Sequence, residues 1–130
     1  MEIVIDTSAI IAVITHEPDR VRILAVTQGA TLRAPQSLHW ELGNAFSAMF
    51  KQRRLTLEQA QRVLVLYHRI PVRLVDVPLS CAVVLAAQLD IYAYDAYMLV
   101  CAQQAGSALL SIDAGLVQAA RTIGIPVIEL

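Results

Sequence analysis

Short apolar runs alternate along the chain with longer segments in which apolar residues recur at helical spacing. The runs cover residues 2–6, 30–34, 72–77, 108–112 and 127–130, and they predict short strands buried on both faces. Between them, apolar positions recur every three or four residues, which is typical of helices packed on a core. Strands separated by helices predict an α/β fold with a parallel sheet of about five strands, covered by helices on both faces.

Capping and breaking residues set the expected limits of the helices. Thr7 or Ser8 is expected to cap the first helix, and Thr56 with Gln59 forms a capping-box pattern at the start of the fourth. In chain order, helices are expected through residues 10–14, from Pro18 to Gly29, over 37–53, from Thr56 to about Arg69, from Pro78 onward, over 95–104 and over 115–123.

Length and composition indicate one domain, residues 1–130, with a large apolar core. Hydrophobic residues make up 57% of the chain and charged residues 16%, so part of the apolar surplus is expected to face another protein chain. No apolar run reaches the length of a membrane span, and no signal-peptide pattern is present, so we expect a cytoplasmic location. Cys81 and Cys101 lie in apolar helical patterns and are expected to be buried free thiols.

Four acidic residues fall where an open parallel sheet would bring them together. Asp6 and Asp113 each end an apolar run, Glu41 lies one turn into the third helix, and Asp95 opens the sixth. Because ligands of α/β sheets bind at the carboxyl ends of the strands, we expect these side chains to share one crevice. Like charges repel and raise one another's pKa, and a hard cation such as Mg²⁺ relieves that repulsion because it prefers oxygen ligands.

Each acid also has an ordinary structural interpretation. Asp6 and Asp95 suit the N-termini of helices, Glu41 suits a solvated helix face, and Asp113 suits the start of a turn. For any single residue the structural interpretation is the better one. The presence of all four, in this order and on these elements, favours a shared site.

Four segments together resemble one known family. They read IDTSA at 5–9, WELGNA at 40–45, YAYDAY at 92–97 and LSID at 110–113. Over essentially its whole length, the chain is similar to the PIN-domain ribonucleases, and in particular to the VapC-like toxins of bacterial and archaeal toxin–antitoxin pairs. Many relatives carry a further acid shortly after the fourth, whereas Ala114 and Gly115 follow Asp113 here. This difference leaves the number of metal ions, one or two, open.

The resemblance implies a PIN-like α/β/α sandwich, metal-dependent hydrolysis of RNA and a co-encoded antitoxin. It also implies that Asp6, Glu41, Asp95 and Asp113 line a site for Mg²⁺ or Mn²⁺. The chemistry requires such a site in any case, because phosphodiester hydrolysis needs an activated water and neutralisation of developing charge. Asp6 and Asp113 are expected as direct ligands, Asp95 as a ligand or the holder of a water, and Glu41 as a ligand or a partner through water.

Hydroxyl and basic side chains supply the expected substrate contacts. Ser8 and Ser111 are expected to hydrogen-bond a carboxylate or a substrate phosphate. The middle helices carry a basic cluster, opposed there only by Glu58, and Arg53 and Arg54 are its candidates for contact with the RNA backbone. A solvated helical hairpin explains the same pattern equally well. The cluster comprises Lys51, Arg53, Arg54, Arg62, Arg69 and Arg73.

Other function classes lack residues that they require. A haloacid-dehalogenase-type phosphatase would need an acid where Ser8 stands, a receiver domain would need a strand-end lysine, and a P-loop would need a glycine-rich first turn. The remaining alternative is a PIN-like domain that binds RNA or protein without cutting. The apolar surplus of the second to fourth helical regions predicts a homodimer and a groove for an antitoxin segment near the crevice.

Overall fold

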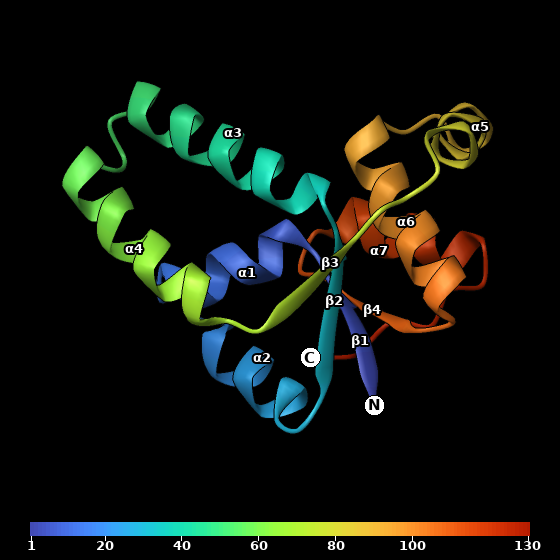
Figure 1. Cartoon of the computed structure of the whole chain (residues 1–130), viewed down its shortest axis with the longest axis horizontal. Helices are drawn as coiled ribbons and strands as arrows, with labels where there is room; N and C mark the ends of the chain where they lie inside the picture. Colours follow the sequence, from blue (N-terminus) through green and yellow to red (C-terminus); the bar gives the residue numbers. More distant parts are fainter.

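A parallel four-stranded sheet in the order β3-β2-β1-β4 forms the centre of the computed structural model, which describes residues 1–130 (Figure 1). The strands are β1 (Glu2–Ile5), β2 (Thr31–Pro35), β3 (Val72–Val75) and β4 (Ala108–Leu110). β1 occupies an inner position, with Ile3 paired to Leu32 on one side and to Ala108 on the other. This order places a reversal of strand progression between β1 and β4, where α/β proteins form their ligand crevice.

Seven helices cover the two faces of the sheet. They are α1 (Thr7–Ile14), α2 (Arg20–Thr27), α3 (Ser37–Lys51), α4 (Leu57–Arg69), α5 (Leu79–Leu89), α6 (Ala93–Ala105) and α7 (Ala114–Thr122). Figure 1 shows α1, α2 and α4 on one side of the sheet and α5, α6 and α7 on the other. The predicted α/β fold with a parallel, helix-covered sheet is therefore confirmed.

The last predicted strand, 127–130, is reduced to a single parallel bridge between Val127 and Leu109. Two backbone hydrogen bonds hold it, from Leu109 N–H to the Pro126 carbonyl and from Ile128 N–H to the Leu109 carbonyl, both 2.8 Å. Pro126 has no N–H to extend the ladder. The sheet thus has four strands and a one-residue extension, slightly fewer than the expected five.

Helix starts differ from expectation at two places that matter for the site. Asp6, rather than Thr7 or Ser8, caps α1, because its carboxylate accepts the Ala9 N–H and Thr7 is already helical. α6 begins at Ala93, two residues before the expected start, so Asp95 lies inside the first turn instead of at the first residue of the helix. The capping box at Thr56 and Gln59 is present as predicted.

Twenty-eight buried hydrophobic residues form one continuous core. Its centre is β1, whose Ile3, Val4 and Ile5 are almost fully buried, and α6. Cys101 is buried and free as expected, but Cys81 is exposed, because it lies on α5, an outer helix that packs mainly on α6. No single helix is long and apolar enough to cross a membrane; α5 and α6 reach that composition only as a pair bent by 113°.

The α3–α4 hairpin stands away from the sheet as an open arm (Figure 1). A side-chain hydrogen bond connects its two helices at the end nearer the sheet, where the Tyr67 hydroxyl and His39 Nδ1 lie 2.7 Å apart. The molecule exposes 7418 Å², against about 6,800 Å² expected for a monomer of this mass. The excess follows from this open shape and leaves apolar side chains uncovered.

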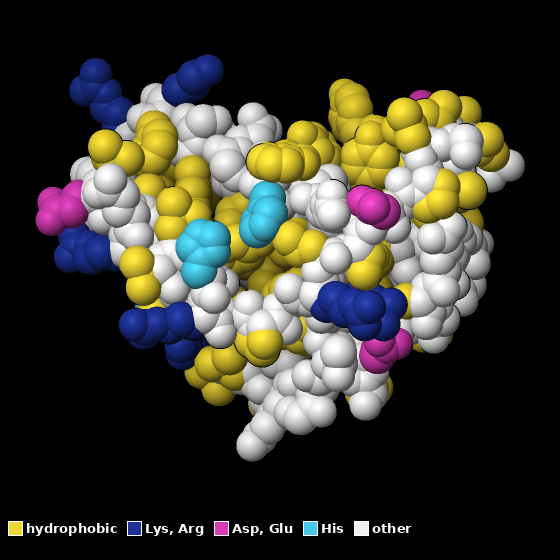
Figure 2. All heavy atoms as spheres, in the orientation of Figure 1, with side chains coloured by type: hydrophobic (Ala, Val, Ile, Leu, Met, Phe, Trp, Pro, Cys, Tyr) yellow, Lys and Arg dark blue, Asp and Glu magenta, His cyan; other side chains and the backbone are white.

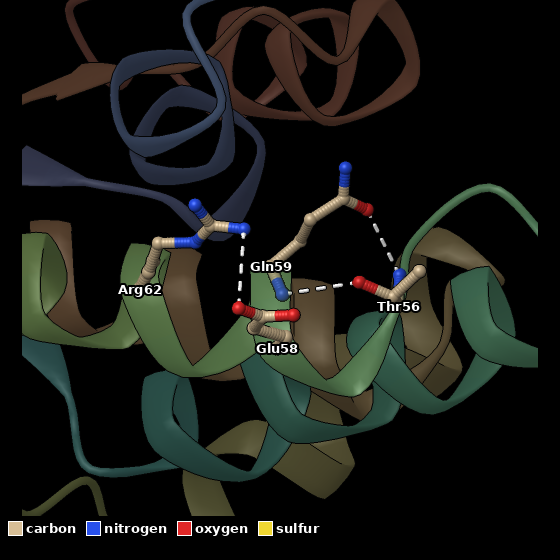
Figure 3. A network of polar contacts seen from close by, with 4 residues as sticks. All are labelled: Thr56, Glu58, Gln59 and Arg62. Carbon is tan, nitrogen blue, oxygen red and sulfur yellow. Dashed lines mark hydrogen bonds and ion pairs between the residues drawn. The ribbon is translucent and has the colours of Figure 1, made fainter.

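The start of α4 offers a direct test of local stability (Figure 3). Thr56→Ala removes the hydroxyl that accepts the Gln59 N–H at 3.1 Å, so the free energy of unfolding should fall by about 1 kcal/mol. Arg62→Gln is the control, because its ion pair with Glu58 is 4.0 Å long and exposed, and such pairs contribute less than about 0.5 kcal/mol. Urea denaturation measures both, and equal losses would contradict the assignment.

Candidate functional site

The four predicted acids line one hollow at the carboxyl ends of β1 and β4. Asp6 follows β1, Glu41 comes from the second turn of α3, Asp95 from the first turn of α6, and Asp113 caps α7. The hollow has a volume of about 290 Å³, and other hollows of the molecule are larger, so its charge rather than its size sets it apart. Its lining comprises Asp6, Thr7, Ser8, Ile11, Glu41, Asn44, Ala45, Asp95, Met98, Asp113 and Leu116.

The Asp6 carboxylate is buried and held by three donors. Ser8 Oγ lies 2.8 Å and 2.9 Å from its two oxygens, Ser111 Oγ donates to Oδ2 at 2.7 Å, and the Ala9 N–H donates to Oδ1 at 3.0 Å. The two serines are themselves fixed, because Ser8 Oγ accepts the Ile112 N–H and Ser111 Oγ accepts the Asp113 N–H. A carboxylate has about four acceptor positions, so about one remains for a further ligand.

The other three carboxylates keep free oxygens. Thr7 donates its hydroxyl to Glu41 Oε1, which leaves Oε2 without a protein partner. Asp113 Oδ1 accepts the N–H groups of Gly115 and Leu116 at 2.9 Å and 3.2 Å, and its Oδ2 is uncommitted. Asp95 makes no side-chain hydrogen bond. The free oxygens of these three residues line the same hollow.

The acids perturb one another, as the sequence analysis expected. The pKa of Asp6 is raised to about 6, mainly by burial and to a smaller extent by the charge of Glu41, against the lowering effect of its hydrogen bonds. Burial raises the pKa of Glu41, and the charges of Asp95 and Asp113 add to that effect. Burial, followed by the charge of Asp113, also raises the pKa of Asp95. The site therefore disfavours its own ionised state, which a bound cation would reverse.

The donor set suits a hard cation that keeps part of its water shell. All of the available side-chain donors are oxygens, which are the ligands of Mg²⁺ and Mn²⁺. No three His, Cys, Asp or Glu side chains lie close enough to enclose a metal ion directly. Zinc requires three or four direct protein ligands, whereas Mg²⁺ is usually held by one or two carboxylates and several waters. The residues present therefore fit Mg²⁺ or Mn²⁺ and do not fit zinc.

The structure places the predicted substrate contacts in two different regions. The Ser8 and Ser111 hydroxyls both donate to Asp6, so of the two alternatives the structure shows the carboxylate contact. Arg53 and Arg54 are exposed at the outer end of the α3–α4 hairpin, outside the hollow. Glu41 lies ten residues before the end of α3 at Lys51, which is about 15 Å of helix.

Two polar lining residues were not predicted as site residues from the sequence. Thr7 donates to Glu41, and Asn44 lies on the same face of α3 as Glu41. The signal for Asn44 was available, because residues three apart on a helix are neighbours. The sequence contained no signal for Thr7, because its position directly after a strand is equally typical of a helix cap.

The raised pKa values predict how the metal-free protein responds to pH. The folded-state pKa of Asp6 is about 6 against an ordinary 3.8, so the unfolded state binds fewer protons between these values. The free energy of unfolding in EDTA should therefore fall by about 2 kcal/mol as pH rises from 4 to 7. Asp6→Asn should flatten this profile, and Asp90→Asn, an isosteric change at an exposed helix C-cap, should not. Urea titrations at several pH values measure the effect.

Magnesium should restore the stability that is lost at neutral pH. Ligand that binds only the folded state raises the melting temperature, and carboxylates must be ionised to bind a metal. Thermal melts should therefore show a larger Mg²⁺-induced rise at pH 7.5 than at pH 5. An equal rise at both pH values, or in the Asp6→Asn protein, would contradict a carboxylate metal site.

Comparison with known proteins places the chain in a family. The model of the PIN domain family matches residues 3–122, and no curated protein matches the sequence. PAE2754 from Pyrobaculum aerophilum is similar in structure, with a TM-score of 0.71 and 21% identity over 92% of this chain and 79% of that one.

Two further solved structures share the fold over nearly the whole of both chains. VapBC2 from Rickettsia felis, bound to a DNA fragment from its promoter, has a TM-score of 0.71 and 17% identity over 99% of this chain and 98% of that one. FitAcB from Neisseria gonorrhoeae has a TM-score of 0.57 and 20% identity over 98% and 96%. With the family match spanning residues 3–122, these findings show that the chain belongs to the PIN domain family.

Proposed function

We propose that this chain is a metal-dependent endoribonuclease and the toxin of a toxin–antitoxin pair. The observation that carries the proposal is the convergence of Asp6, Glu41, Asp95 and Asp113 on one hollow at the reversal of strand order. PIN domains are generally nucleases, and two of the structural neighbours are VapBC2 and FitAcB. These relationships support a nuclease and a partner protein for this chain.

The residues of the chain divide the catalytic tasks. Bound among the carboxylates, Mg²⁺ or Mn²⁺ would supply the positive charge and Lewis acidity that phosphodiester hydrolysis needs. Asp113 Oδ2 and the Asp95 carboxylate are the freest oxygens for this ion, with Asp6 contributing its remaining acceptor position. Glu41 Oε2 is uncommitted and its raised pKa suits it to accept a proton from an attacking water. Ser8, Ser111 and Thr7 hold these carboxylates in place.

RNA is the proposed substrate, and a longer strand would extend beyond the hollow. Arg53 and Arg54 at the outer end of the hairpin would contact the backbone of such a strand at a distance from the scissile bond. Figure 2 shows Lys and Arg side chains projecting there, at the upper left of the view. The proposed place of action is the cytoplasm, where RNA and a co-encoded antitoxin are both present.

The nuclease proposal predicts a graded loss of activity. Asp6→Asn, Asp95→Asn and Asp113→Asn should each abolish the cleavage of single-stranded RNA in Mg²⁺ or Mn²⁺, and EDTA should abolish cleavage by the unchanged chain. Ser111→Ala should reduce cleavage by about 10- to 100-fold, because groups that orient metal ligands have effects of that size. Asp90→Asn, which changes an exposed acid outside the hollow, should leave the rate unchanged.

Gel analysis of a fluorescent RNA, with all variants purified in the same way, measures these rates. Cleavage by the Asp6→Asn protein in EDTA at the unchanged rate would refute the mechanism. A folded protein that binds Mg²⁺ and RNA but never cleaves would instead support the second candidate, a non-catalytic PIN-like binding domain.

Exposed apolar side chains on two faces support two protein partners. Val83 and Val84 on α5 are more than half exposed. On the α3–α4 hairpin, Leu57 and Val65 are also more than half exposed. Figure 2 shows these hydrophobic areas over the hairpin and over α5. We propose that the α5 face joins two copies of the chain and that the hairpin face receives the antitoxin, since large apolar patches mark protein interfaces.

Substitutions on each face should weaken binding of only one of the two partners. Val83→Asp with Val84→Asp should convert a dimer to a monomer in light scattering, because charge is disfavoured in an interface core. Leu57→Asp should leave the dimer intact and weaken capture of the small protein encoded beside the chain. A monomeric unchanged chain at high micromolar concentration would refute the dimer. A neighbouring product that neither co-purifies nor inhibits cleavage would refute the antitoxin.

A further inference from the structure

A second hollow opens where β2 and β3 end, beside the first two turns of α3. Its volume is about 250 Å³, half of its lining residues are hydrophobic, and nothing in the proposed catalysis uses it. The lining comprises Pro35, Gln36, Ser37, Trp40, Asp76, Val77, Leu79 and Tyr97. Pockets for drug-sized ligands measure about 300–1,000 Å³, so this hollow suits a smaller ring system.

Trp40 forms an exposed but fixed wall of this hollow. It is the only tryptophan of the chain, and 68% of it is exposed. The His39 ring contacts it edge to face, with ring centroids 6.1 Å apart. His39 is also hydrogen-bonded to the hydroxyl of the buried Tyr67. An aromatic face that is both exposed and held in position is a platform for stacking.

Polar groups without partners line the same hollow. The Ser37 hydroxyl oxygen is buried and makes no hydrogen bond. Gln36 precedes α3 without capping it through its side chain, so the first N–H groups of the helix lack a side-chain acceptor. Asp76 follows β3 with an exposed carboxylate that makes no ion pair. A buried polar group without a partner is unfavourable until a ligand supplies one.

The second hollow is adjacent to the acidic one. Trp40 and Glu41 are consecutive residues of α3, so their Cα atoms are about 3.8 Å apart. Trp40 lines the second hollow and Glu41 the acidic one. α6 is shared in the same way, because Tyr97 lines the second hollow and Asp95 the acidic one. Side chains of consecutive helix residues point to different faces of the helix, so a strand with a phosphate among the acids would present another nucleotide of the same strand to Trp40.

We propose that this second hollow is a nucleobase subsite, in which Trp40 stacks an unpaired base of the RNA while Ser37 and Asp76 contact the edge of that base. The proposal rests on the proposed nuclease function and adds to it a means of sequence preference. A carboxylate can only accept hydrogen bonds. Uracil has no amino group, and its one donor, N3–H, lies between two carbonyl oxygens that repel a carboxylate. Bases with an amino group, namely adenine, cytosine and guanine, are therefore preferred over uracil at this position.

An apolar protein side chain fits the hollow less well than a base. Such a side chain would cover Trp40 but leave the Ser37 hydroxyl and the Asp76 carboxylate desolvated without partners. A base offers a π-face to the tryptophan and donors and acceptors to the polar groups. Stacking of a base on an aromatic side chain is also the usual way in which proteins hold single-stranded RNA.

The single tryptophan makes the subsite directly observable. Titration of a short single-stranded RNA into the protein in EDTA should quench the fluorescence of Trp40 saturably, without any cleavage. The Asp6→Asn protein should show the same quenching. An oligomer of the same length that lacks bases should bind without quenching. AMP, CMP and GMP should quench more strongly than UMP at equal concentration.

Variants separate stacking from a structural role. Trp40→Ala should weaken RNA binding about tenfold or more, as loss of one stacked base does, and Trp40→Phe should restore much of the affinity. Asp76→Asn should reduce the preference over uracil, because an amide both donates and accepts. Phe50→Ala, an exposed aromatic change at the far end of α3, should leave RNA affinity unchanged. Fluorescence anisotropy of labelled RNA measures each affinity, and circular dichroism confirms each fold.

The outcomes distinguish this proposal from the nuclease proposal. RNA that is bound and cleaved without quenching, or equal quenching by the base-free oligomer, would overturn the subsite and leave the nuclease standing. Base-dependent quenching in a protein that never cleaves would support the subsite and overturn the nuclease. A change in Trp40 fluorescence with protein concentration alone, or only upon addition of a partner protein, would assign Trp40 to a protein interface and refute the subsite.

Discussion

The hydrogen bonds around the Asp6 carboxylate join the two strands that define the site. Ser8 on the β1 side and Ser111 on the β4 side both donate to this one group, and each serine oxygen accepts a backbone N–H from the segment after β4. The carboxyl ends of β1 and β4 are therefore fixed to each other where the strand order reverses. The position of Asp113, and with it the geometry of the whole acidic hollow, depends on this junction.

The acids combine structural and chemical roles that the sequence presented as alternatives. Asp6 caps α1 and Asp113 caps α7, as the structural interpretation required, yet both also line the hollow. A cap uses one carboxylate oxygen, so Asp113 retains the other for a ligand. Asp6 is the more destabilised of the two carboxylates, because burial raises its pKa to about 6. At neutral pH the ionised Asp6 therefore lowers the free energy of unfolding of the metal-free protein, and a bound cation would offset that loss.

Much of the fold and the four acids could be predicted from the sequence, because they follow from short-range rules. Strand and helix periods located the elements, and Thr56 with Gln59 marked the start of α4. Features set by long-range packing could not be predicted. The exposure of Cys81 depends on which face of α5 packs on α6, and the partner of Thr7 lies 34 residues away. Pro126 limits the last strand because it has no N–H for the ladder, and it stands directly before the predicted run 127–130.

The two hollows beside α3 separate two requirements of a sequence-selective nuclease. In the proposed nuclease, the acidic hollow would meet only phosphate and water, which are the same at every position of an RNA, so its carboxylates would carry no sequence information. The Trp40 hollow presents a stacking face and unpaired polar groups, which respond to the identity of a base. Because consecutive residues of one rigid helix contribute to both, a base held by Trp40 would fix the register of the strand among the acids. Catalytic position and sequence preference are then coupled through α3.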